Sequence, residues 1–146
     1  MNYIKMTNTK SIILSLTAVM MIFYFSACSR KASFQTSSIV PAAKGSVKVK
    51  KDKNSNYQIK ISLTNLAESK RLQPSKETYV VWLQTDNNLI KNIGQINSST
   101  GFLSSKLKAS FQTVSSFKPN KIFITAEDDA TIQYPGSQVV LSTNNF

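Results

Sequence analysis

An alternation of apolar and polar residues dominates the chain beyond residue 44 and constrains its fold more than any other feature. In Tyr57–Thr64, for example, Tyr, Ile, Ile and Leu alternate with Gln, Lys, Ser and Thr. This pattern is typical of β-strands with one buried face. Similar or β-rich runs lie at 47–50, 89–96, 107–113, 121–126 and 138–141. Turn-forming residues separate these runs. We therefore predict an all-β domain over 45–146, an antiparallel β-sandwich of about seven strands, with a partly open barrel as the alternative.

The run Thr78–Leu83 differs from the others because its apolar residues are consecutive. Such a strand is expected at the centre of a sheet that is covered on both faces. Trp82 lies in this run, and we expect it to pack in the core. An aromatic face that binds sugars is the alternative interpretation.

Residues 1–27 have the composition of a secretory signal peptide. Lys5 and Lys10 precede the apolar run Ile12–Phe25, and no acidic residue occurs in this part of the chain. The run is shorter than the roughly 20 residues that a membrane-spanning helix needs, and small residues follow it. We predict a cleaved signal peptide at 1–27, and the alternative is an uncleaved anchor with a single span.

The segment Phe25-Ser26-Ala27-Cys28 resembles the lipobox of bacterial lipoproteins, in which an apolar residue and two small residues precede a Cys. Leu is the commonest residue in that family at the position of Phe25. The resemblance implies that Cys28 is lipidated on its sulfur, with palmitate as the expected acyl group, and that cleavage leaves it as the new N-terminus. Two or more acyl chains anchor a protein stably. An ordinary buried Cys behind a plain signal peptide is the alternative.

Residues 28–44 are predicted to be the lipidated Cys and a flexible tether, because the segment is rich in Ser and Thr and lacks apolar periodicity. Arg30 and Lys31 would then lie at the lipid headgroups. In some Bacteroidetes-type lipoproteins, acidic residues just after the Cys form a surface-export signal. This chain has basic residues there, so we expect a membrane lipoprotein that faces the periplasm.

Basic residues outnumber acidic ones, 18 to 7, which gives a net charge of +11. A functional interpretation is contact with an anionic surface such as lipid headgroups or a glycan. The alternative is that these lysines only keep strand surfaces soluble and protect sheet edges from pairing. Nucleic acid is not an expected partner, because the chain is predicted to be exported and lacks aromatic-interleaved binding motifs. The candidate contact residues are Arg30, Lys31, Lys48, Lys50, Lys51, Lys53, Lys70 and Arg71.

The chain contains no His and a single Cys, which excludes sites that depend on a His base, an imidazole ligand or several thiolates. We therefore expect no catalytic residues, no cofactor and no metal. The acidic triplet Glu127-Asp128-Asp129 could bind Ca²⁺, but it lacks the spacing of a calcium loop and is interpreted as a solvated turn.

Several segments occur in an order that resembles the extracytoplasmic C-terminal domain of anti-sigma-K-type factors. They are a Tyr-x-x-Trp-Leu strand, an apolar-Gly element, a Thr-x-Glu strand end and a Pro-Gly turn, found at 79–83, 92–96, 122–127 and 135–141. The resemblance covers about residues 40–143 and implies a β-sandwich outside the cytoplasmic membrane. It does not imply sigma-factor binding, because a separate cytoplasmic segment has that role in the family and only residues 1–11 precede the apolar run here.

These observations lead to two functional expectations. The first is a non-enzymatic membrane lipoprotein whose β-sandwich binds a protein or an envelope component, with a link to anti-sigma or envelope signalling implied by the resemblance. The second is a binding module that takes an anionic ligand through its basic hairpin loops.

Overall fold

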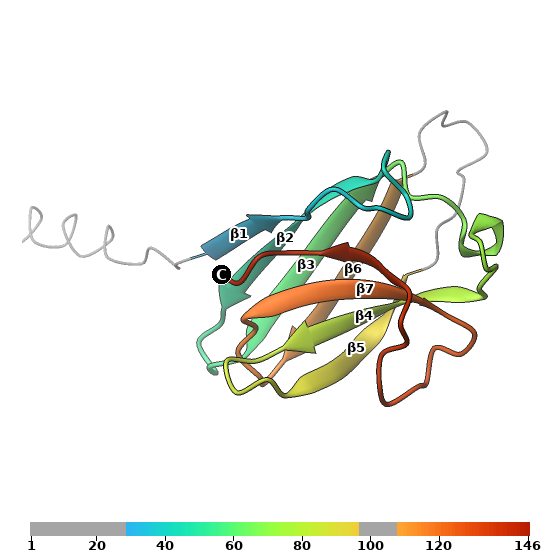
Figure 1. The fold of residues 1–146 in the computed structure, drawn as a ribbon. Helices are drawn as coiled ribbons and strands as arrows, with labels where there is room; N and C mark the ends of the chain where they lie inside the picture. Colours follow the sequence, from blue (N-terminus) through green and yellow to red (C-terminus); the bar gives the residue numbers. More distant parts are fainter. Residues whose placement is uncertain (1–28, 97–107) are drawn as a thin grey trace, which may run out of the picture.

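The computed structural model describes residues 29–96 and 108–146, and these form an all-β fold of two four-stranded antiparallel sheets (Figure 1). The predicted fold class, a β-sandwich, is confirmed. The first sheet has the order β1-β2-β3-β6 and the second the order β5-β4-β7-β8. The strands are β1 (Ser29–Ser33), β2 (Lys44–Lys51), β3 (Tyr57–Thr64), β4 (Thr78–Gln84), β5 (Ile90–Ile96), β6 (Lys108–Ser115), β7 (Lys121–Glu127) and β8 (Val139–Ser142).

The main core lies between the two sheets and follows from the alternation of side chains. Val47 and Val49 of β2 and Ile59, Ile61 and Leu63 of β3 are buried in it, while their neighbours along each strand face outward. The second sheet contributes residues of β4, β7 and β8. The 3₁₀ turn η2 (Ser69–Arg71) lies in the connection from β3 to β4, which crosses from one sheet to the other.

Strand β4 is central and buried on both faces, as its consecutive apolar residues predict. Its outward side forms a second, smaller cluster in which Trp82 stacks on Phe123, with ring centroids 6.2 Å apart. The loop between β7 and β8 lies against this cluster, and the Asn92 side chain donates to the carbonyls of Ala130 and Ile132, at 2.9 Å each. Trp82 is therefore a packing residue with no exposed surface.

The prediction of a flexible tether at 28–44 is wrong for the residues that the structure describes. Residues Ser29–Ser33 form strand β1, which pairs antiparallel with β2 along its whole length. Phe34 then forms a bridge to Thr143, and the Gln35 N–H donates to the Ser142 carbonyl at 2.9 Å. The segment thus joins the edges of both sheets. Cys28 and the predicted signal peptide lie outside the described residues.

Gly94 lies where β5 of the second sheet approaches β6 of the first. Its φ of 133° is a conformation that residues with a side chain rarely adopt, and a Cβ there would lie 2.8 Å from the Phe111 ring. The register also shifts at this point, since Val81 pairs with Gly94 and Trp82 with Asn92. Gly94 therefore marks an irregularity in β5 that admits the Phe111 ring between the sheets.

Within 29–96 and 108–146, no helix has the length and apolar character needed to cross a membrane.

Candidate anion-binding surface

The outer face of the first sheet is a basic surface, here called the lysine face. The antiparallel register places Lys31 opposite Lys48 and Lys48 opposite Lys60, so that three lysines form a row across β1, β2 and β3. Lys50 lies two residues from Lys48 on the same side of β2. All four side chains are exposed, and none of the other outward residues of these strands is acidic: they are Ser, Gln and Thr residues and Lys44.

Like charges directly opposite each other on neighbouring strands destabilise a sheet. None of the salt bridges among the described residues involves the row, so no carboxylate neutralises Lys31, Lys48 or Lys60. A shallow depression of about 180 Å³ lies beside the row, lined by Lys48, Lys50, Gln58, Ile59, Lys60 and Gln112. This surface offers ammonium groups and an amide-lined hollow to an anion.

Arg30, Lys51 and Lys53 lie at the end of the sandwich where β1 begins, next to the lysine face. Arg30 and Lys51 line a cavity of about 180 Å³ together with Tyr57 and Lys118, and Val49, Pro119 and Phe146 complete its wall. The Lys51 ammonium lies 6.0 Å from the centre of the Tyr57 ring, within the range of a cation–π interaction.

The predicted set of basic residues does not form one patch, because Lys70 and Arg71 lie at the opposite end of the sandwich in η2. There they are paired with acidic residues: Lys70 Nζ lies 3.0 Å from Glu77 Oε2, and Arg71 Nε lies 3.2 Å from Glu68 Oε2. Sequence reasoning also missed Lys60. Its alternation with buried residues in β3, together with the β2–β3 hairpin, is the signal that could have identified it.

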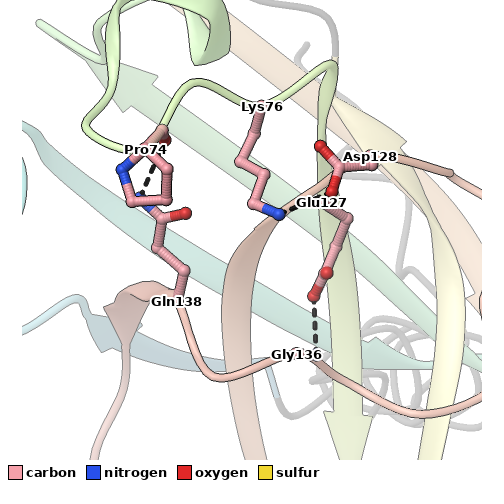
Figure 2. Close-up of polar contacts among 6 residues, drawn as sticks. All are labelled: Pro74, Lys76, Glu127, Asp128, Gly136 and Gln138. Carbon is pink, nitrogen blue, oxygen red and sulfur yellow. Dashed lines mark hydrogen bonds and ion pairs between the residues drawn. The ribbon is translucent and has the colours of Figure 1, made fainter.

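The acidic triplet does not converge on one point. Figure 2 shows Glu127 and Asp128 turned toward different partners. The buried Glu127 carboxylate accepts a hydrogen bond from the Gly136 N–H at 2.8 Å, while Asp128 pairs with Lys76 at 2.6 Å. Asp129 accepts from the backbone N–H and the hydroxyl of Thr131, and these bonds, the backbone one foremost, lower the pKa of the Asp129 carboxyl.

Glu127 and Asp129 therefore stabilise the loop between β7 and β8 through hydrogen bonds to Gly136 and Thr131. Gln138, whose amide lies 3.5 Å from the Pro74 carbonyl, closes the other side of a groove of about 470 Å³ beside Glu127 (Figure 2). In the part of the chain that the structure describes, no group of three or more His, Cys, Asp or Glu residues is placed to hold a metal ion.

The segments that resemble anti-sigma-K-type domains contact one another through structural bonds. The Trp82 indole N–H donates to the buried Thr125 hydroxyl at 2.7 Å, and Glu127 accepts from Gly136. The Tyr79 hydroxyl donates to the Ala67 carbonyl at 2.8 Å. Because their polar groups bond to other parts of the chain, the residues of these motifs stabilise core packing and turns.

No family model matches the chain, and no curated protein or solved structure matches it either. The resemblance to anti-sigma-K-type domains therefore stays a prediction.

Proposed function

We propose that the protein is a membrane lipoprotein, anchored at Cys28 and facing the periplasm, whose non-catalytic β-sandwich binds an anionic component of the cell envelope on the lysine face. The observation that carries the proposal is the row of Lys31, Lys48 and Lys60. When no anion is bound, the repulsion between these lysines lowers the stability of the fold. An anion that lies across the row reduces this repulsion.

The geometry of the lysine face favours a polymer with repeated negative charges. Neighbouring strands lie about 4.7–4.9 Å apart, and residues two apart on one strand are separated by about 6.5–7 Å. Lys50 follows Lys48 along β2, so ammonium groups are spaced both across the strands and along one of them. Lysine heads on flexible stems adapt to anions of different shape. An acidic or phosphorylated glycan has charges at comparable intervals.

The absence of His from the chain supports a binding role rather than catalysis. The expected protein partner and the link to envelope signalling are the competing hypothesis. Enrichment of one envelope protein by the wild type, unaffected by changes in the lysine face, would favour that hypothesis.

Glycan binding is tested with heparin as a polyanion probe at about 0.15 M salt, where exposed charges act over about 8 Å. The double variant Lys48→Gln/Lys60→Gln is compared with Lys70→Gln/Arg71→Gln, which loses the same charge at the opposite end. We expect a clear loss of affinity in the first variant and little change in the second. An equal loss in both would show that only net charge matters and would refute the site.

The anchor is tested separately. In Cys28→Ser we expect the protein to leave the membrane fraction and palmitate labelling to be lost. Retention of the variant in membranes, together with unlabelled wild type, would refute lipidation.

A further inference from the structure

The end of the sandwich where β1 begins, here called the basal end, carries basic residues and exposed apolar side chains side by side. Its basic residues come from several segments: Arg30, Lys51, Lys53, Lys91, Lys118 and Lys121. These segments are the start of β1, the end of β2 with the β2–β3 hairpin, the start of β5, and the β6–β7 connection with the first residue of β7, and the register places them at one end.

Acidic residues are distributed in the opposite way. Of the 7 in the chain, Asp52 and Asp86 belong to the basal end, and both have internal partners. Asp52 accepts from the backbone N–H groups of Asn54 and Asn56, and Asp86 pairs with Lys118 at 2.8 Å. The other acidic residues, Glu68, Glu77, Glu127, Asp128 and Asp129, lie at the opposite end or in the loop that leaves it. The sandwich is therefore electrically polar along its strands.

Exposed apolar side chains lie among the basal cations. Phe117 is 41% exposed in the β6–β7 connection, and Leu89 is 42% exposed in the β4–β5 turn. The Lys91 ammonium lies 5.6 Å from the centre of the Phe117 ring. Apolar side chains surrounded by cations are typical of surfaces that bind the interface of an anionic bilayer, where the ring enters the headgroup region and each cation meets lipid phosphates.

Ser29, the residue that follows Cys28 in the sequence, begins β1 and so lies at the basal end. Ser29 is already paired with Lys50 in β1, and consecutive Cα atoms are about 3.8 Å apart, so no tether separates the predicted anchor from the fold. We propose that the basal end docks on the anionic lipid leaflet that holds the acyl chains of Cys28, with Phe117 and Leu89 in the headgroup region. This inference rests on the lipid anchor of the proposed function. It leaves the lysine face along the side of the sandwich open to a glycan.

The test uses the full chain, purified from membranes and reconstituted in vesicles of equimolar phosphatidylcholine and phosphatidylglycerol. Because lipidation consumes the thiol of Cys28, a second cysteine is the only thiol that a fluorescent label can reach. We place it at the basal end in Phe117→Cys or, with Phe117 retained, in Asn87→Cys. Ser75→Cys beside η2 is the matched control. Spin-labelled lipids then quench labels that lie near the bilayer.

We expect strong quenching at the two basal positions and none at position 75. In vesicles of phosphatidylcholine alone, or at about 1 M salt, basal quenching should fall, because the Debye length is then only about 3 Å. Equal quenching at both ends would overturn the docking. Basal labels that are shielded from an aqueous quencher without vesicles would overturn it too, in favour of contact with a second copy of the chain.

The two proposals fail differently. Uptake of one label per chain by the wild type would show a free Cys28 thiol and refute the anchor. A wild type that takes no label, combined with unquenched basal positions, leaves the anchor intact and overturns only the docking. In Lys48→Gln/Lys60→Gln we expect basal quenching to be unchanged, because those residues belong to the lysine face.

Discussion

The repulsion within the lysine row has a measurable consequence for stability. Lys48 lies directly opposite two other lysines, Lys31 and Lys60, whereas Lys60 has Lys48 on one side and Gln112 on the other. Directly opposed pairs change stability by roughly 0.2–1 kcal/mol each. Lys48→Gln removes two repulsive pairs and should raise the free energy of unfolding by about 0.4–2 kcal/mol at low salt. Lys60→Gln removes one pair and should give about half of this increase.

Urea unfolding of both variants and of wild type, at about 0.01 M and about 1 M salt, measures the effect. The increase should almost disappear at the higher salt concentration, because the charges are then screened. Lys108→Gln is the control, since Lys108 lies opposite Thr64 and relieves no repulsion. Equal stability of Lys48→Gln and wild type at low salt, or an increase that does not depend on salt, would refute the argument that the empty row costs stability.

Three further outcomes follow from buried polar contacts. Gly136→Ala should lower the free energy of unfolding by about 1–3 kcal/mol in urea, since its Cβ would lie 2.6 Å from Glu127 Oε2 and would displace a buried carboxylate from its N–H donor; a Ser137→Ala control should be close to wild type. Thr125→Val should also lower the free energy of unfolding by about 1–3 kcal/mol, because the indole N–H of Trp82 loses its buried acceptor, and an unchanged urea midpoint would contradict this. Burial raises the pKa of Tyr79 from 10.0 to about 12, so the unfolded chain releases this proton first and stability should fall as pH rises through that range. In Tyr79→Phe this part of the fall should be missing from unfolding curves measured across the same pH values.

The strands of the sandwich could be predicted wherever the side chains of a single strand reveal its two faces. In β3, Ile59 and Ile61 alternate with polar residues, and in β4 consecutive apolar residues reveal burial on both sides. Strand β1 could not be found in this way. It is an edge strand whose only partly buried residue is Ala32, and β2 supplies its hydrogen bonds through the backbone. Because backbone bonds place few demands on its side chains, β1 has the same polar composition as a linker.

The candidate site was predictable in part for a similar reason. The clustering of Lys48 and Lys50 is local and visible in the sequence. Lys60 could be placed opposite Lys48 by requiring that Val49 and Ile59 face the same core across one hairpin. Lys31 could not be placed, because its position depends on β1. Lys70 and Arg71 are equally basic in the sequence, but the chain crosses to the other sheet at the far end of β3 and takes them away from the rest.

The bridge between Phe34 and Thr143 also has a kinetic consequence. It joins residues that lie far apart in the sequence. The adjacent hydrogen bond from the Gln35 side chain to the Asn144 side chain, at 2.8 Å, spans 109 positions. Contacts over such separations form slowly, since the loop-closure entropy must be overcome before they stabilise anything. The segment that follows Cys28 can therefore complete the sandwich only after the residues around Thr143 have been synthesised. Until then the outer edges of the two sheets lack the contacts that join them at this point.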